Sequence, residues 1–292
     1  MAKVKGPLFI FLSFLSLISL NNIHLLGEMM GILLSIIPNS AKNNTKVNLQ
    51  LCFPNMSEQE IKFLTRESLK ETSKNLLESG KSWITYPKTG VNNIIKVEGM
   101  KLVSESLIQD KGVILFTSHL GNIEILISFL SENFKCTIPY KPAKINAIDD
   151  LMKQARSLMG AEMVKADSGG VKSALSALNR GEILIMASDQ VPKKSNGIIS
   201  NFFGIPALSV SLISSLAIRT KSPCHSVSCI RLKKGKGYRI IFSERLDKLN
   251  ILDLQEGVNL MNAELEECIM KAPEQYAWEY KRFKHSKFEN PY

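Results

Sequence analysis

The sequence predicts an α/β fold with a mixed, mostly parallel sheet flanked by helices, preceded by an N-terminal hydrophobic membrane-anchor helix. Two short runs, residues 113–116 and 183–187, contain only apolar side chains, which is typical of strands buried on both faces of a parallel sheet. Around these runs, strand-like and helix-like segments alternate as they do in βαβ units. The sequence has no internal repeat and no low-complexity linker, so one globular domain is expected after the anchor.

The composition narrows the class of protein. The chain has 292 residues, enough for one full core, and a net charge of +10 from 37 basic and 27 acidic residues. Such an excess suits a nucleic acid, an anionic membrane or an acidic protein partner, and no nucleic-acid-binding motif occurs in the sequence. The five cysteines are odd in number and lack Cys-x-x-Cys spacing, which argues against a disulfide framework or a zinc site. We therefore expect a membrane-associated protein of a reducing compartment that binds no nucleic acid.

The N-terminus carries two apolar runs, residues 7–20 and 23–38. Fourteen residues at about 1.5 Å each fall short of a hydrocarbon core about 30 Å thick. A signal peptide shares this pattern, but no small-x-small cleavage site follows. We expect an uncleaved anchor within residues 1–40, with the second run at the interface or at the start of the globular domain 41–292. Lys3 and Lys5 favour a cytoplasmic N-terminus, while re-entrant and two-pass insertion both stay open.

The remaining elements follow in order along the chain. A capping box at Ser57 and Glu60 predicts the start of the first long helix. Helices are expected at residues 57–78, 102–108, 123–130, 148–159, 171–178, 207–220 and 252–270. Strands are expected at 91–96, 113–116, 136–140, 163–164 and 183–187, with a hairpin of 224–230 and 238–242. We predict a tight aromatic turn at 201–206 and a solvated charged loop at 231–237. The alternative for the charges of this loop is binding of a phosphate or of a carrier.

The chemistry is expected just after the strand at 113–116, because ligands bind beyond the carboxyl ends of strands in open α/β sheets. His119 and Glu124 are five residues apart, about 140° around one regular helix, so on such a helix their side chains would diverge. If His119 lies in the turn and Glu124 in the first helical turn, the carboxylate can reach the imidazole. It would then fix the tautomer and leave the other nitrogen as a general base for a hydroxyl. The alternative is a histidine that merely caps the helix, with Glu124 favoured there by the helix dipole.

A second strand ends in polar residues at the same edge of the predicted sheet. Asp189 and Gln190 follow the apolar run 183–187 as His119 follows the run 113–116. Carboxyl ends of parallel strands share one edge, so these side chains are expected near His119. Asp189 could equally be only a helix cap or a turn former.

Several motifs are specific in combination. They are Asn48 to Pro54, His119-x4-Glu124, Tyr140-Lys-Pro142, Arg156, Gly181-Glu182 before Asp189-Gln190, Phe202-Phe-Gly204, Arg219-Thr220, and Pro273-Glu-Gln-Tyr-x-Trp278 running into Lys281 to Lys284. With them the chain resembles, over almost its full length, the lipid A biosynthesis (lauroyl/myristoyl) acyltransferase family of Gram-negative bacteria. The wider glycerolipid acyltransferases usually have aspartate where Glu124 stands, so the glutamate favours the lipid A branch. The mannoside acyltransferases of phosphatidylinositol share much of the pattern.

The resemblance implies a glycerolipid-acyltransferase-like catalytic domain with O-acyltransferase activity. A fatty acyl chain would move from acyl carrier protein, or from acyl-CoA, to a hydroxyl of a Kdo-bearing lipid A precursor. His119 would be the general base and Glu124 would hold its imidazole. Arg156 would stabilise the oxyanion or hold an acceptor phosphate. Asp189, followed by Gln190, would hold Arg156 or orient a substrate group. No metal or redox cofactor is expected.

The resemblance also implies a place in the bacterial inner membrane, with the catalytic domain on the cytoplasmic side. The expected partners are acyl carrier protein, the lipid A precursor and the anionic inner membrane, all of which suit a basic enzyme. Two alternatives stay open: an acyltransferase of another glycolipid or glycerophospholipid, and a catalytically silent lipid-binding relative. The intact set of His119, Glu124, Arg156 and Asp189 argues against a silent protein.

Overall fold

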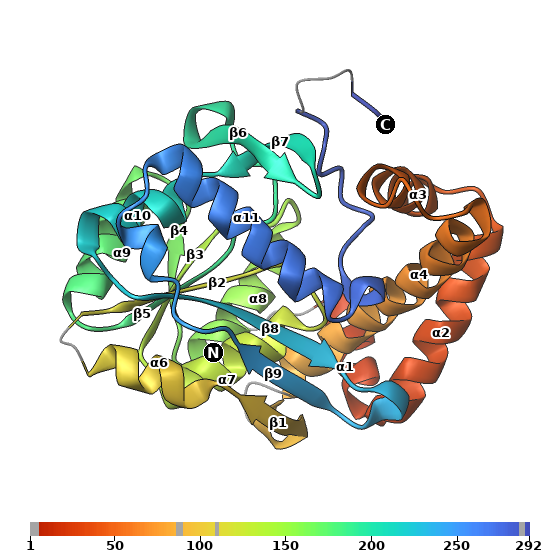
Figure 1. Cartoon of the computed structure of the whole chain (residues 1–292). Coiled ribbons are helices and arrows are strands. Elements are labelled where there is room, and N and C mark those ends of the chain that lie inside the picture. Colours follow the sequence, from red (N-terminus) through yellow and green to blue (C-terminus); the bar gives the residue numbers. More distant parts are fainter. Residues whose placement is uncertain (1–5, 86–89, 109–110, 286–289) are drawn as a thin grey trace.

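The chain is built around one seven-stranded sheet with the strand order β1-β9-β8-β2-β5-β3-β4 (Figure 1). This computed structural model describes residues 6–85, 90–108, 111–285 and 290–292. Lys3 and Lys5, on which the predicted orientation of the N-terminus rests, lie outside these residues. The strands of the sheet are β1 (Ile94–Glu98), β2 (Val113–Thr117), β3 (Cys136–Tyr140), β4 (Glu162–Lys165), β5 (Ile183–Ala187), β8 (Cys224–Arg231) and β9 (Tyr238–Phe242).

The strand directions confirm the predicted mixed, mostly parallel sheet. Every neighbouring pair is parallel except β8 and β9, which form the predicted antiparallel hairpin. β2 lies between β5 and β8, and Thr117 at its carboxyl end stands opposite Ala187 of β5. The segments that follow β2 and β5 therefore leave the sheet side by side.

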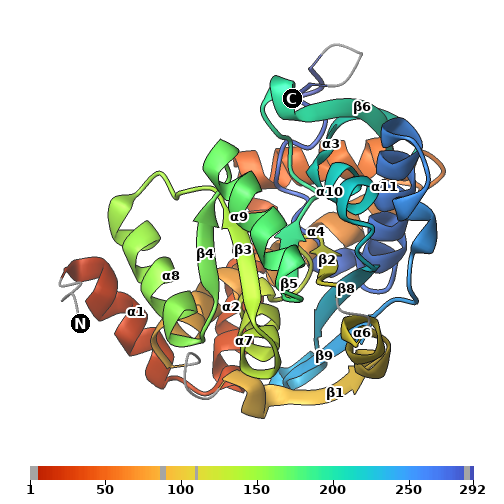
Figure 2. The ribbon, with the colours of Figure 1, turned by 90° about the vertical axis from the view of Figure 1, so that its left-hand side faces the viewer.

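Helices cover both faces of the sheet, as Figures 1 and 2 show. Beyond the N-terminal pair they are α3 (Ser40–Cys52), α4 (Glu58–Gly80), α6 (Met100–Leu107), α7 (Ile123–Asn133), α8 (Asn146–Leu158), α9 (Ser168–Asn179), α10 (Leu212–Thr220) and α11 (Leu254–Met270). Alternate residues of β2 enter two different cores, as the period of a strand requires. Ile114 and Phe116 pack with α4, α9, α10 and α11, whereas Val113 and Leu115 pack with α6 and α7. All four side chains are fully buried, which accounts for the unbroken apolar run.

The predicted helix at 207–220 is wrong in its first part. β6 (Gly197–Phe202) and β7 (Ile205–Val210) form a separate antiparallel pair, and the helix α10 begins only at Leu212. The predicted aromatic turn lies between these strands, where Phe203 and Gly204 both have positive φ. Pairing with β6 and burial of Ala207 and Leu208 override the helix propensity of these residues.

The predicted N-terminal anchor is divided into two helices, α1 (Pro7–Leu17) and α2 (Leu20–Ile36), bent by 118°. Among the described residues no single helix has the length and hydropathy to cross a bilayer. The two helices of this bent pair, taken together, have the required length and hydropathy. α2 packs closely on α4, because a Cβ atom on Gly31 would lie only 2.3 Å from the Cα atom of Lys70. The second apolar segment is thus in contact with the first long helix of the globular part, one of the two positions expected for it.

Candidate active site

The centre of the candidate site is a hydrogen-bonded pair formed by His119 and Asp189. Each follows its strand by two residues, since β2 ends at Thr117 and β5 at Ala187. The Nδ1 atom of His119 lies 2.7 Å from Oδ1 of Asp189, and the backbone N–H of His119 donates to Oδ2 at 3.0 Å. Both carboxylate oxygens therefore accept from the same residue. The predicted meeting of the two strand ends is confirmed.

The electrostatics of this pair follow from its burial and its charges. Burial alone would lower the pKa of His119, but the charge and the hydrogen bond of Asp189 outweigh it and raise that pKa above the ordinary 6.5. Burial would raise the pKa of Asp189, yet the imidazole and the backbone N–H bring it below its usual range. Glu279 adds to the rise at His119 and Arg156 opposes it. Asp189 is thus ionised at neutral pH and accepts the proton on Nδ1.

The other ring nitrogen of His119, Nε2, has Gln190 as its neighbour. Because Nδ1 carries its proton toward Asp189, Nε2 has a free lone pair, and the side-chain nitrogen of Gln190 lies 3.3 Å from it as a donor. The His119 side chain keeps 36 % of its surface exposed, while Asp189 keeps 3 %. A hydroxyl arriving from outside can therefore reach Nε2 by replacing Gln190. An imidazole held in this way by a buried carboxylate has the geometry needed to accept a proton from a hydroxyl.

The expected contact between Glu124 and His119 is replaced by a different pairing. Glu124 does lie in the first turn of α7, but its two oxygens accept from Nε and Nη2 of Arg156 at 3.0 and 2.7 Å. Arg156 belongs to the last turn of α8, and its planar fork matches a carboxylate better than one ring nitrogen does. Burial would lower the pKa of Arg156, and Glu124 raises it. Asp189 was expected to hold Arg156 or a substrate group, and it holds His119 instead.

A C-terminal segment to which the sequence analysis gave no role in the site also reaches His119. The backbone N–H of Ala277 donates to the His119 carbonyl at 3.0 Å, and Leu120 forms a β-bridge with Tyr276. Burial and the nearby Asp189 raise the pKa of Tyr276 well above its ordinary value. Burial also raises the pKa of Glu279, which accepts a hydrogen bond from Thr72. The motif from Pro273 to Trp278 was visible in the sequence, but only the tertiary contact assigns it to the site.

The prediction of a solvated loop at 231–237 holds for its three lysines, which are exposed, and is wrong for Arg231. Arg231 is 3 % exposed and forms ion pairs with Glu71 and Glu78 on α4. In the structure Arg231 is the last residue of β8 and not part of the loop, which distinguishes it from the lysines.

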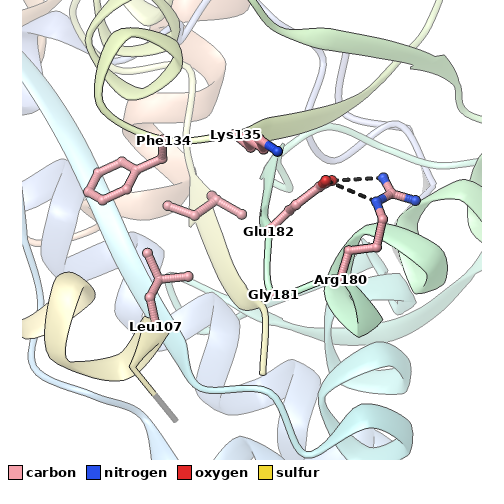
Figure 3. Close-up of a pocket in the computed structure, with 7 residues that line it drawn as sticks. Leu107, Phe134, Lys135, Arg180, Gly181 and Glu182 are labelled. Atoms are coloured by element: carbon pink, nitrogen blue, oxygen red, sulfur yellow. Dashed lines mark hydrogen bonds and ion pairs between the residues drawn. The ribbon is translucent and has the colours of Figure 1, made fainter. Parts of the chain in front are cut away.

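Two cavities lie away from the imidazole. One of about 320 Å³ is at the opposite, amino-terminal end of β3 and β5, where Arg180 pairs with Glu182 (Figure 3). The other, an open groove of about 650 Å³, is lined by Phe53 and Phe203 and by the end of α11. His119 lines neither of these two. Within the described part of the chain, no cluster of three histidine, cysteine or carboxylate side chains has the geometry to hold a metal ion.

Comparison with known proteins gives one consistent family. Residues 8–285 match the family described as bacterial lipid A biosynthesis acyltransferase. The lipid A biosynthesis lauroyltransferase of Escherichia coli (strain K12) is 27 % identical over 238 residues, which cover 81 % of this chain and 77 % of the relative. The lipid A biosynthesis palmitoleoyltransferase of the same strain is 25 % identical over 268 residues, covering 89 % and 84 %. A lipid A biosynthesis acyltransferase of Haemophilus influenzae is 26 % identical over 239 residues, covering 81 % and 75 %.

Proposed function

Since this chain belongs to the bacterial lipid A biosynthesis acyltransferases, and is an acyltransferase, we propose that it moves a fatty acyl chain from a thioester to a hydroxyl of a lipid A precursor with His119 as the base. The observation that carries this proposal is the half-exposed imidazole whose Nδ1 is held by buried Asp189. Both groups stand at the carboxyl edge of the parallel strands, where α/β sheets bind ligands.

The proposed reaction uses Nε2 of His119 to accept and return one proton. The acceptor hydroxyl gives its proton to Nε2 while its oxygen forms a bond to the thioester carbonyl carbon. The tetrahedral intermediate then breaks its carbon–sulfur bond, and the imidazolium returns the proton to the leaving sulfur. An ester and a free thiol are the products. Asp189 stabilises the imidazolium, and general-base assistance of this kind contributes about 10²–10⁴ in rate.

We propose that Arg156 binds negative charge next to this centre. Its guanidinium is always charged, and Glu124 fixes its plane by two hydrogen bonds. It would stabilise the oxyanion of the tetrahedral intermediate or hold a phosphate of the acceptor. Glu124 then serves the reaction by orienting Arg156 and not by holding the imidazole.

The donor and the acceptor are proposed by their chemistry. The donor is the thioester of acyl carrier protein or of coenzyme A, and the acceptor is a Kdo-bearing lipid A precursor. A lipid A precursor carries phosphates, and acyl carrier protein is acidic, so both suit a chain of net charge +10. The reaction as proposed needs no metal or redox cofactor.

We also propose that α1 and α2 lie against the inner membrane, with the catalytic part on its cytoplasmic side. Nine large apolar side chains of these two helices are between 42 and 84 % exposed, namely Ile10, Phe11, Phe14, Leu17, Leu25, Leu26, Met29, Leu33 and Ile36. So dense an apolar surface is typical of a membrane contact. Sedimentation with anionic phospholipid vesicles tests it: Phe11→Ser with Phe14→Ser should release the protein. Ile251→Ser, which removes an isoleucine 78 % exposed before α11, should not.

The test of the function is transfer of radiolabelled acyl chains by purified protein. Each donor is offered with a Kdo-bearing lipid A precursor, a glycerophospholipid or another glycolipid as acceptor. We expect transfer to the lipid A precursor, lost in His119→Ala and kept in His285→Ala, which removes an exposed histidine outside the site. Transfer only to another lipid would show that the protein is an acyltransferase of another glycolipid or of a glycerophospholipid. Binding of the precursor without transfer would show that the protein is a catalytically silent lipid-binding relative. A His119→Ala protein within a few-fold of wild type would remove His119 as the base.

A further inference from the structure

A buried ionic cluster contacts the loop that runs from His119 to Glu124, through Asn122, and does not include His119 itself. At its centre are Glu78 of α4, which is 0 % exposed, and Arg231 at the end of β8, which is 3 % exposed. His24 of α2 is 2 % exposed and completes the buried group. Replacing such an ion pair by apolar side chains of similar volume is often neutral for stability or better. Core stability alone therefore does not account for it.

Among the described residues, the Glu78 carboxylate accepts four hydrogen bonds from side chains. Oε1 accepts from Nε of Arg231 and from Nε2 of His24, each at 2.6 Å. Oε2 accepts from Nη2 of Arg231 and from Nδ2 of Asn122, each at 2.7 Å. The His24 tautomer is fixed, because the backbone N–H of Gly235 donates to its Nδ1 atom. Each Glu78 oxygen thus accepts from two donors. Only an ionised carboxylate has two oxygens that can both act purely as acceptors.

Asn122 connects this cluster to the catalytic loop. It is the N-cap of α7, where its Oδ1 atom accepts from the backbone N–H of Ile125. Its Nδ2 atom points to Glu78, so the carboxylate fixes which way the amide faces. His119 lies three residues before Asn122 and Glu124 lies two residues after it. The cap therefore sets where the loop ends and where the helix with Glu124 begins.

The loop is fixed on its other sides by backbone contacts. Gly121 donates to the carbonyl of Gln275, and a Cβ atom on Gly121 would lie 2.0 Å from the carbonyl oxygen of Cys229. Gln275 in turn exchanges two hydrogen bonds with the backbone of Arg231. Arg231, which holds Glu78, is thus also bonded to Gln275, whose backbone carbonyl contacts the loop at Gly121.

We propose that Glu78 is a positioning residue for acyl transfer: by holding Asn122 and Arg231 it fixes the loop from His119 to Glu124, and through His24 it joins α2 to the same cluster. The inference rests on the proposed function. Because the carboxylate acts through the loop, its loss should lower kcat more than it raises the KM for the acyl donor. A displacement of about 1 Å at a catalytic group costs up to about 100-fold in rate.

The test compares Glu78→Gln, Asn122→Ser and Glu98→Gln as full-length proteins. In Glu78→Gln the side-chain NH2 group faces two donors whichever way it turns. In Asn122→Ser the hydroxyl still caps α7 but no longer reaches the carboxylate. Glu98→Gln is the control, because Glu98 also accepts two hydrogen bonds of 2.7 Å from one arginine, Arg239, at the β1 edge of the sheet.

Two readouts are measured on each protein. We expect kcat to fall at least tenfold in Glu78→Gln and Asn122→Ser, with KM changed less than threefold, and to stay within twofold in Glu98→Gln. Hydrogen exchange of the amides of residues 118–125, which needs no turnover, should become at least tenfold faster in the first two proteins only. If Glu78→Gln does not fold, Asn122→Ser decides. Folded variants with wild-type kcat and wild-type exchange would overturn the proposal. Failure of the proposed function is distinct, since it would appear as wild-type protein without transfer whatever the exchange rates.

Discussion

Asp189→Asn is the substitution that tests most directly the proposed role of Asp189 in holding the His119 imidazole. The carboxylate accepts two hydrogen bonds from His119, one from the ring and one from the backbone N–H. An asparagine offers one oxygen and one NH2 group in their place. If its oxygen accepts from the backbone N–H, its NH2 group faces Nδ1, which must then be the acceptor. The ring proton moves to Nε2, and Nε2 can no longer take a proton from the acceptor hydroxyl.

The expected loss can be estimated from this change of tautomer. General-base assistance contributes about 10²–10⁴ in rate, and we expect kcat of Asp189→Asn to fall within that range. The pH profile gives a second measurement. The proposed reaction requires the neutral imidazole, so kcat/KM is expected to rise with pH through the pKa of His119, which Asp189 raises above the ordinary 6.5. Without the carboxylate charge, burial lowers that pKa, so any residual activity should rise at a lower pH than in the wild type.

The assay is acyl transfer by purified protein between pH 5 and pH 9, with near-ultraviolet circular dichroism to verify the fold. Asp189→Glu is a useful companion, because it keeps the charge and should retain part of the raised pKa. An Asp189→Asn protein with kcat within tenfold of wild type and an unmoved acidic limb would refute the role assigned to this carboxylate.

Three further predictions concern the groups around the pair. Glu124→Gln should lower kcat while leaving the acidic limb of the pH profile in place, because Glu124 holds Arg156 and not the imidazole; a limb that moves as in Asp189→Asn would contradict this. Gly121→Ala should lower the free energy of unfolding in urea by about 2 kcal/mol or more, because the residue has φ +61° and its Cβ would press on the Cys229 carbonyl; an unchanged unfolding midpoint would contradict it. Glu78 should make stability depend on acidic pH: its pKa falls from the ordinary 4.5 to about 2 on folding, since Arg231 and His24 together outweigh burial, so about 3 kcal/mol of stability present above pH 4.5 should be lost as the pH falls toward 2. Urea unfolding at stepwise lower pH measures that loss, and a flat dependence below pH 4.5 would exclude it.

The strands around the site could be read from the sequence because they are buried on both faces. Residues 113–116 and 183–187 have no polar side chain, and this is the pattern that a central parallel strand requires. The capping box at Ser57 and Glu60 is equally local, and the structure contains both of its hydrogen bonds. The approach of His119 to Asp189 followed from topology alone, since parallel neighbours release their next residues at one edge.

Features that depend on a distant partner could not be read in the same way. The strand β7 has apolar residues that suit a helix as well, and only its pairing with β6 and its contact with α11 decide the matter. Arg231 stands beside three exposed lysines in the sequence, and its burial follows from Glu71 and Glu78, about 150 residues earlier. The close packing of α2 on α4 could not be predicted either, because it depends on Gly27 and Gly31 lying against the backbone of two lysines of α4.

The exchange of carboxylate partners shows how the spacing of His119 and Glu124 acts. The nearest acid in the sequence is not the one that holds the imidazole, because α7 carries Glu124 toward α8 as soon as the helix begins at Ile123. The spacing therefore sets the length of the loop between His119 at the end of β2 and Glu124, which holds Arg156, on α7. Each basic side chain of the site then has its own carboxylate, Asp189 for His119 and Glu124 for Arg156. A site arranged in this way could take up one proton on Nε2 of His119 while a separate carboxylate keeps Arg156 fixed for an oxyanion or a phosphate.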